Sequence, residues 1–396
     1  MVAAPAARAG KGAPVRALIV GGGPAGDAVA AGLRDAGFDG EIVLVGTESE
    51  PPYERPHLSK GYLLGTVPRE KLRLRPAEQY RELGVQLRLG EQVEDLGLER
   101  STAELESGEK ISWDLLCIAT GSSARRLASF ENALYLRELA DADVLRAVLE
   151  RGELLNVIGA GFIGCEVAAA ARLRGCAVRV YEALAQPLLR VLGPELGAYV
   201  ADVHRAHGVE MHLEVEQLPD LGEPVVAGVG SIPRTALAER AGLAIEGGVV
   251  VDAFGRTDAP GVFAAGDVTR FWSPLYEARI RVEHFQTAQR QGFAVGRAMA
   301  GATEPYSEVP WFWSDQFDLK LKMAGLLRPG LTTVLRGDPA TGRFALFHLD
   351  HGLVVAVEAS NAGGEFIAGK QFIHKRSHVD PTALADIDVS LRKVVV

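Results

Sequence analysis

The chain has 396 residues, which predicts two or three domains. It is 47% hydrophobic and 23% charged, as ordinary globular proteins are. The formal net charge of −9 excludes a general basic field for nucleic acid, and the chain has no RNA- or DNA-binding motif. Its apolar runs are too short and too interrupted to predict a transmembrane helix, so neither nucleic acid nor membrane is expected as a partner.

Residues 1–14 are mostly Ala, Gly and Pro with scattered Arg and Lys, and they lack the apolar block of a signal peptide. We therefore expect a disordered tail on a cytoplasmic protein. Cys117, Cys165 and Cys176 form no C-x-x-C or C-x₄-C pair, which favours buried cysteines in a reducing compartment over a redox role. A disulfide reductase is disfavoured because it needs a dithiol.

The first predicted element is a strand at 16–20, followed by Gly21-Gly22-Gly23-Pro24-Ala25-Gly26 and a helix to about Ala36. G-x-G-x-x-G between a strand and a helix is typical of a dinucleotide-binding turn. The first glycine permits the turn, the second admits a pyrophosphate and the third lets the helix pack closely. A strand at 41–45 then precedes residues 47–50, where such folds place an acid for the ribose hydroxyls.

The same signal recurs at Gly159-Ala160-Gly161-Phe162-Ile163-Gly164, after a strand at 155–158 and before a helix to Arg174. Glu182 closes the next predicted strand, 177–181. A carboxylate there accepts bonds from a free 2′-hydroxyl and repels a 2′-phosphate, which favours NAD over NADP. An ordinary surface glutamate is the alternative. Two such turns predict two dinucleotides with electrons passing between them.

The rest of the chain is predicted to complete the first unit and to add a strand-rich block. A buried strand at 115–118 ends in Ala119-Thr120-Gly121, and residues 226–233 return the chain to the first unit. Residues 257–267 are predicted as a strand whose end presents Asp267. After Pro310, strands are predicted at 332–335, 344–349 and 353–358, followed by helical segments.

Several phrases, in the family's order, resemble the FAD- and NADH-dependent ferredoxin reductases of bacterial oxygenases and cytochromes P450, which are related to apoptosis-inducing factor. They are the first glycine motif, Tyr53–Lys60, Ala119–Gly121, Gly161–Glu166, Thr257–Asp267 and Trp311–Gln316. The resemblance implies an α/β protein with two Rossmann-like domains of the glutathione-reductase type and an α+β C-terminal domain. The implied boundaries are 15–122 and 238–305 for FAD, 123–237 for NADH and 306–396 for the C-terminal domain.

The resemblance also implies cofactor-binding residues. For FAD they are Gly21, Gly23, Gly26, Glu48, Arg55, Lys60, Thr120, Gly121, Arg125, Gly266, Asp267, Glu283, His284, Phe285 and Trp313. For NADH they are Gly159, Gly161, Phe162, Ile163, Gly164, Glu166, Glu182 and Gly230. A helix after Glu283-His284-Phe285 is expected to point its N-terminus at the flavin's pyrimidine edge. His284 alone is more typical of a structural histidine than of a catalytic acid. No metal site is expected.

The catalytic residues implied by the resemblance are Lys60, Glu166 and Trp313. Reduced flavin gains negative charge at N1, so a lysine beside the ring stabilises it, and a glutamate neutralises that lysine at rest. A solvated loop lysine and a helix-surface acid are the alternatives. Trp311 and Trp313 are predicted on one strand face, either near the flavin and its electron partner or in simple packing.

Some positions depart from the family pattern. Thr47 stands where Asp is common, so Glu48 is expected to take over the ribose contact, and Phe285 stands where Trp is common. Residues 213–224 are too short for the strand hairpin that relatives have. This shortening is either a harmless loop deletion or a change that weakens NADH binding and marks a flavoprotein turned to another use.

The predicted function is hydride transfer from NADH to FAD and single-electron transfer to an acidic [2Fe–2S] ferredoxin, by a monomer or homodimer. A local basic patch is expected to bind that ferredoxin, with a plain solvated face as the alternative. Arg73 and Arg75 are predicted on one exposed strand face, and Lys320 and Lys322 follow the tryptophan segment. The alternatives are a related small-molecule reductase of the monodehydroascorbate or quinone type, an NADH oxidase, or an NADH-responsive binding protein.

Overall fold

The computed structural model describes residues 14–396, so the expected tail lies almost wholly outside the described residues. Contacts group the chain into two compact units. The first contains Glu70–Ser123 and Ile232–Glu308 together with the chain up to Glu54, and the second contains Arg55–Arg69, Ala124–Ser231 and Val309–Val396. Two of the five points at which the chain passes from one unit to the other lie within β8 (Ser122–Ala124) and β13 (Ser231–Pro233). The three-domain division stays a prediction.

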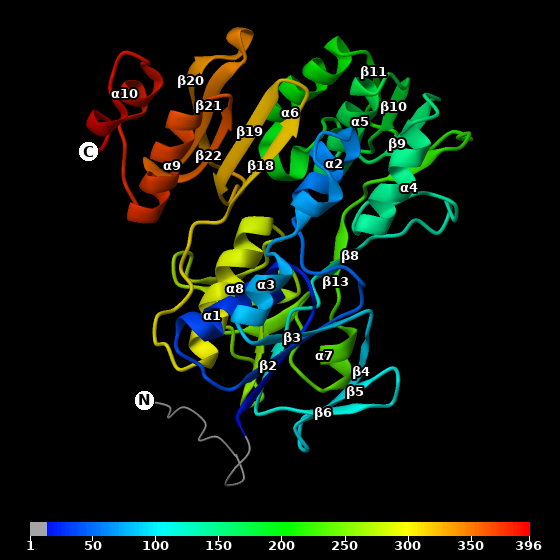
Figure 1. Ribbon diagram of the computed structural model, residues 1–396. Helices are drawn as coiled ribbons and strands as arrows, with labels where there is room; N and C mark the ends of the chain where they lie inside the picture. Colours follow the sequence, from blue (N-terminus) through cyan, green and yellow to red (C-terminus); the bar gives the residue numbers. More distant parts are fainter. Residues whose placement is uncertain (1–13) are drawn as a thin grey trace. The chain divides into compact units, whose positions relative to one another are not determined.

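A five-stranded parallel sheet forms the centre of the first unit, in the order β15-β7-β1-β2-β3 (Figure 1). Apart from the edge strand β3, its strands are almost continuously apolar, as expected when both faces of a parallel sheet are covered. Four of the five residues of β1 are buried, and so are all but the first of β2. The strands are β1 (Arg16–Val20), β2 (Glu41–Gly46), β3 (Val85–Leu89), β7 (Leu115–Ile118) and β15 (Val262–Ala264).

Helices α1 (Pro24–Asp35) and α8 (Phe285–Met299) pack against each other through glycines in the first unit. A Cβ on Gly32 would lie 2.1 Å from the carbonyl oxygen of Phe293, and a Cβ on Gly296 would lie 2.1 Å from that of Val29. The two backbones therefore approach more closely than any larger residue permits.

The remaining elements of the first unit surround this centre. They are the antiparallel strands β4 (Val93–Gly97), β5 (Thr102–Leu105) and β6 (Lys110–Ser112), the sheet of β14 (Val249–Val251), β16 (Thr269–Ser273) and β17 (Ala278–Ile280), and the helices α3 (Ala77–Glu82) and α7 (Ala236–Arg240).

The second unit contains a four-stranded parallel sheet in the order β11-β10-β9-β12. Its strands are β9 (Leu155–Ile158), β10 (Val178–Tyr181), β11 (Val209–His212) and β12 (Val225–Ala227). Residues 213–224 connect β11 to β12 without any strand, so no hairpin extends the sheet there. The helices are α2 (Gly61–Leu64), α4 (Leu139–Leu149), α5 (Phe162–Leu173) and α6 (Leu189–Ala206).

The second unit also contains a five-stranded antiparallel sheet in the order β18-β19-β22-β21-β20. Its strands are β18 (Trp311–Gln316), β19 (Leu319–Gly325), β20 (Thr332–Asp338), β21 (Arg343–Asp350) and β22 (Leu353–Ser360). Helix α9 (Gly363–Lys375) packs on the face that carries Trp311, whereas α5 and α6 contact the face that carries Phe312 and Gln316. A short helix, α10 (Pro381–Ala385), follows.

One predicted strand is shorter than expected, and another does not form. Residues 257–267 form a strand only over β15, because Pro260 and Gly261, whose φ is +76°, turn the chain just before it. Arg69–Leu72 is a 3₁₀ helix, and beyond it only Arg73 forms an isolated bridge, with Tyr53. The exposed strand face predicted for Arg73 and Arg75 therefore does not exist.

Among residues 14–396, no helix is both long and apolar enough to cross a membrane. The same residues contain no group of three or more His, Cys, Asp or Glu side chains placed to hold a metal ion.

Candidate active site

The first glycine motif forms a tight turn between β1 and α1. Gly21 has a φ of +130°, and a Cβ there would lie 2.1 Å from the carbonyl oxygen of Ala119. A Cβ on Gly26 would lie 2.0 Å from the carbonyl oxygen of Gly21. Gly23 is the N-cap of α1, and no side chain among the described residues caps that helix end. The N–H groups at the start of α1 thus suit the pyrophosphate of a dinucleotide.

Further predicted FAD residues follow the carboxyl ends of neighbouring strands of the same sheet. Glu48 comes after β2 and accepts a hydrogen bond from the Tyr53 hydroxyl, and Thr120 and Gly121 come after β7. Gly266 and Asp267 follow β15, and the Ser122 hydroxyl lies 3.3 Å from a carboxylate oxygen of Asp267. The carboxyl edge of a parallel sheet is where open α/β folds bind ligands.

The start of α8 lies in the same unit. His284 is its N-cap and Phe285 its first residue, so the predicted helix start is correct. Glu283 pairs with Arg281, at 2.5 Å between Oε1 and Nη1. The Gly266 N–H donates to Gln291 Oε1 at 2.8 Å, which ties the end of β15 to the second turn of α8. The remaining predicted FAD residues, Arg55, Lys60, Arg125 and Trp313, belong to the second unit.

The second glycine motif lies between β9 and α5. Gly159 has a φ of +90°, and a Cβ on Gly164 would lie 1.9 Å from the Gly159 carbonyl oxygen, so packing dictates both glycines. By contrast, a Cβ on Gly161 would find its nearest neighbour, the Gly228 carbonyl oxygen, at 3.6 Å. Protein packing therefore leaves room beside Gly161, as a turn that receives a pyrophosphate requires.

Glu182 is fixed beside this turn at the end of β10. Its carboxylate accepts the Ala160 N–H at 2.7 Å and the Leu184 N–H at 2.9 Å. Two backbone donors hold an acid at the position where a ribose is recognised in such folds. Phe162 and the exposed Ile163 open α5, and the Gly230 carbonyl accepts the Arg125 N–H at 2.9 Å.

We expect Gly161→Val to leave folding intact and to raise the KM for NADH by about tenfold or more, because the new side chain occupies space that only the dinucleotide needs. The thermal unfolding midpoint checks the first point, and steady-state kinetics with ferricyanide as acceptor checks the second. Gly222→Ala, at a loop glycine with nothing near its Cβ position, is the control. An unchanged KM in Gly161→Val would contradict the assignment.

Lys60 and Glu166 form an ion pair in the second unit, with 2.6 Å between Nζ and Oε2. Their side chains are 14% and 3% exposed, so both charges are largely removed from water. Lys60 lies between the 3₁₀ helix Arg55–Ser59 and α2, whereas Glu166 lies on α5, two residues after the last glycine of the motif. The Ser59 hydroxyl donates to the same Glu166 oxygen, and the Ser314 hydroxyl donates to the other.

Trp313 is adjacent to Ser314 in the sequence but lies on the opposite face of β18. Its ring centroid is 5.9 Å from that of Trp311, so the two indoles share a face, as predicted. Trp311 also packs against Phe366 of α9 at 5.6 Å. On the opposite face, Phe312 contacts Phe162 of α5 edge to face at 4.6 Å.

Sequence reasoning missed the polar residues that surround Glu166. Two buried serines, Ser59 and Ser314, donate hydrogen bonds directly to Glu166. Two more buried residues, Gln316 and His204, are connected to it through Ser314 by further hydrogen bonds. The alternation along β18 was the available signal, because Ser314 and Gln316 occupy the face opposite the tryptophans. A polar pair on a buried strand face indicates a hydrogen-bond network.

The predicted basic patch is partly wrong. Arg75 pairs through Nε with Oδ1 of the buried Asp27 at 2.8 Å, and the Tyr80 hydroxyl donates to the same oxygen at 2.7 Å. Arg75 therefore anchors α1 of the first unit. Arg73 is exposed, Lys320 is exposed on β19, and the Lys322 ammonium lies 5.6 Å from the centre of the Phe366 ring.

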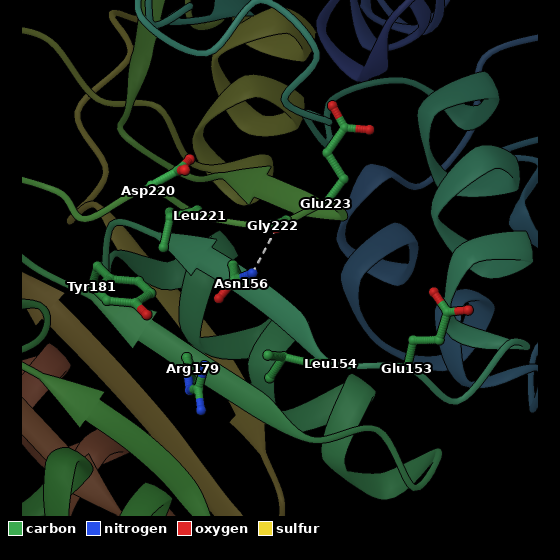
Figure 2. A pocket seen from close by; sticks show the side chains of 9 residues that line it. All are labelled: Glu153, Leu154, Asn156, Arg179, Tyr181, Asp220, Leu221, Gly222 and Glu223. Atoms are coloured by element: carbon green, nitrogen blue, oxygen red, sulfur yellow. Dashed lines mark hydrogen bonds between the residues drawn. The ribbon is translucent and has the colours of Figure 1, made fainter.

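A cavity of about 270 Å³ lies on the parallel sheet of the second unit (Figure 2). Asn156 and Arg179 of neighbouring strands line it, together with Tyr181 and the loop around Gly222, whose carbonyl accepts the Asn156 amide at 2.8 Å. It borders the start of β9, whereas dinucleotides bind at the carboxyl ends of such strands. None of the predicted site residues lines this cavity.

All three cysteines are free and buried, and burial raises the pKa of the Cys117 and Cys165 thiols. The three cysteines therefore do not supply a dithiol pair that could relay electrons. Two glycine turns on parallel sheets, joined to an antiparallel C-terminal sheet, define an oxidoreductase of the two-dinucleotide class.

Comparison with known proteins identifies the family. Residues 15–218 and 221–292 match the pyridine nucleotide-disulphide oxidoreductases, and residues 311–395 match the reductase C-terminal domain. The chain therefore belongs to the pyridine nucleotide-disulphide oxidoreductase family, and the expected fold class is confirmed. The interruption of the first match falls inside the shortened segment 213–224.

Relatives span nearly the whole chain. The ferredoxin–NAD(+) reductase component of the anthranilate 1,2-dioxygenase system of Burkholderia cepacia is 38% identical, over 95% of this chain and 98% of its own. Putidaredoxin reductase of Pseudomonas putida is 35% identical, over 96% of both chains. The crystal structure of the covalent putidaredoxin reductase–putidaredoxin complex matches with a TM-score of 0.92 at 34% identity, over 96% and 98% of the chains. The resemblance to ferredoxin reductases is confirmed.

Proposed function

We propose that this chain takes a hydride from NADH onto FAD and passes the electrons singly to a [2Fe–2S] ferredoxin that feeds an oxygenase or a cytochrome P450. The observation that carries the proposal is the buried Lys60–Glu166 pair, whose acid stands on α5 directly behind the second glycine turn. A buried charge pair is costly to maintain, so its place beside a dinucleotide turn is best explained by chemistry there. The named activities of the relatives support it.

The residues present fit both dinucleotides. FAD would be held by the uncapped start of α1 and by the groups at the carboxyl edge of the first unit's sheet, including Glu48 and Asp267. NADH would be held by the uncapped start of α5, with Glu182 at its ribose. When bound, FAD supplies the conversion of a two-electron hydride donor to one-electron transfer.

In this proposal, Lys60 supplies positive charge to the reaction and Glu166 balances it at rest. Ser59 and Ser314 each donate a hydrogen bond to the Glu166 carboxylate, and these bonds hold it in place beside Lys60. Trp313 stays a candidate for a position near the flavin. A cytoplasmic location also stays a prediction.

Ferredoxin-dependent reduction of cytochrome c tests this function. The FAD-loaded chain with NADH is expected to reduce cytochrome c only slowly until a [2Fe–2S] ferredoxin is added, and then in proportion to that ferredoxin. Rapid reduction of a quinone or monodehydroascorbate without any response to several ferredoxins would identify a small-molecule reductase and overturn the proposal.

We further propose that Lys320 and Lys322 of β19 are part of the surface that binds the acidic ferredoxin. They are two residues apart on β19 and therefore lie on the same face of the strand, where Lys320 pairs with Asp315 and Lys322 with Trp313 of β18. Two ammonium groups on one strand face suit an acidic partner, because complementary charge speeds encounter. The exposed Arg73 of the first unit remains a second candidate, and Arg75 is better explained by its bond to Asp27.

Reversing both charges, Lys320→Glu with Lys322→Glu, is expected to slow ferredoxin reduction about tenfold at low salt and to leave ferricyanide reduction unchanged. Lys375→Glu, at an exposed lysine at the end of α9, is the matched control. Stopped-flow mixing at several salt concentrations makes the comparison. Equal slowing with both acceptors, or in the control as well, would reject this docking surface.

A further inference from the structure

A series of buried hydrogen bonds runs from His204 on α6, through Gln316 and Ser314 on β18, to Glu166 on α5. Ser314 donates from Oγ to Glu166 Oε1 at 2.5 Å. Gln316 donates from Nε2 to Ser314 Oγ at 3.0 Å, and its Oε1 lies 2.8 Å from Nε2 of His204. Ser314, Gln316 and His204 are each 0% exposed, so water cannot replace any of these bonds.

Each group in this line fixes the direction of the next bond. An amide nitrogen can only donate and its oxygen can only accept. With the Gln316 nitrogen on Ser314, the serine oxygen accepts there and its single proton is left for Glu166. With the Gln316 oxygen on His204, the histidine must carry its hydrogen on Nε2.

The surroundings of His204 favour the same direction. Its Nδ1 is buried with no partner among the described residues, and burial lowers the pKa of the ring to about 4. The neutral ring has one N–H, and a buried N–H without an acceptor costs more than a buried bare nitrogen. The hydrogen therefore belongs on Nε2, where Gln316 accepts it.

We propose that His204, Gln316 and Ser314 form a one-way hydrogen-bond chain that keeps the Glu166 carboxylate turned toward Lys60. They are positioning residues for hydride transfer, an inference that rests on the proposed function. If His204 loses its donor, the Gln316 amide is free to reverse. The Ser314 proton then turns to the amide oxygen, and Glu166 loses one of its three side-chain donors.

The variants separate this role from simple packing. Ser314→Ala removes the last bond of the chain, and His204→Leu removes the first. His204→Gln restores an N–H donor near the place of Nε2. Ser360→Ala is the matched control, because Ser360 is also 0% exposed, lies in the same sheet and donates only to the Gly342 carbonyl, at 2.8 Å.

The first measurement needs no activity. Nitrogen-15 NMR of the histidine-labelled protein, with His204 assigned from its absence in His204→Leu, is expected to show a neutral ring with hydrogen on Nε2 between pH 6 and 8. In Ser314→Ala that signal is expected to persist. A hydrogen on Nδ1, or a charged ring, would overturn the proposal.

The second measurement is the rate constant of flavin reduction by NADH in the holoenzyme. Ser314→Ala and His204→Leu are expected to lower this rate constant about tenfold at unchanged NADH affinity. His204→Gln is expected to recover most of the loss, and Ser360→Ala is expected to behave like the wild type. If Ser314→Ala matches Ser360→Ala, the chain has no positioning role. If the wild type itself is not reduced by NADH, the proposed function fails instead, and the NMR result still decides the direction of the chain.

Discussion

Replacing Glu166 by leucine is expected to destabilise the protein by about 3 kcal/mol, because it leaves the largely buried Lys60 ammonium without its carboxylate partner. It also removes the acceptor of the Ser59 and Ser314 hydroxyls, so two further buried donors lose their bonds. The urea midpoint measures the loss. Flavin reduction by NADH in the remaining folded protein is expected to fall on the order of 10²-fold, since the charge balance around the reaction is lost.

A double-mutant cycle separates the pair from its surroundings. Lys60→Met is expected to destabilise less than Glu166→Leu, because Glu166 keeps two hydroxyl donors, and the double variant should recover part of the stability lost in Glu166→Leu. The control is Glu210→Leu, which breaks an exposed pair with Arg179 in the same unit and is expected to cost about 0–1 kcal/mol. Additive losses in the cycle would show that Lys60 and Glu166 do not interact in solution.

Glu182→Gln is expected to relax the choice between NADH and NADPH. The amide keeps one oxygen that can accept the Ala160 N–H, so the glycine turn stays in place, but the charge that repels a 2′-phosphate is gone. We expect the ratio of kcat/KM for NADPH to that for NADH to rise about tenfold to a hundredfold, since removing a like-charge contact is worth one to a few kcal/mol.

Glu210→Gln on the neighbouring strand β11 is the control for that change, because it removes a charge that is not at the turn. The ratio should stay near the wild-type value there. A Glu182→Gln enzyme that still discriminates as the wild type does would show that other residues select the coenzyme.

The glycine turns were predictable because they depend on local order alone. Strand, G-x-G-x-x-G and helix are adjacent in the chain, and Gly26 and Gly164 are required by atoms five residues earlier. The Lys60–Glu166 contact, between residues far apart in sequence, was expected only from the family resemblance, since no periodicity relates them.

Where tertiary contacts decide, sequence reasoning failed. Arg75 was predicted on an exposed face because it alternates with leucines, yet Asp27 of α1 draws it into a buried pair. The hydrogen-bond chain from His204 to Glu166 joins α6, β18 and α5, and no local pattern links those segments. The shortening of residues 213–224 was visible in the sequence, and the structure shows there a loop without strands.

The most direct test of the account is anaerobic stopped-flow mixing of the FAD-loaded chain with NADH, and separately with NADPH, while the flavin absorbance is followed. We expect rapid bleaching by NADH, much slower bleaching by NADPH, and recovery of the oxidised absorbance when a [2Fe–2S] ferredoxin is added. A flavin that stays oxidised with NADH would contradict the proposed function, because NADH would then not transfer its hydride to the FAD.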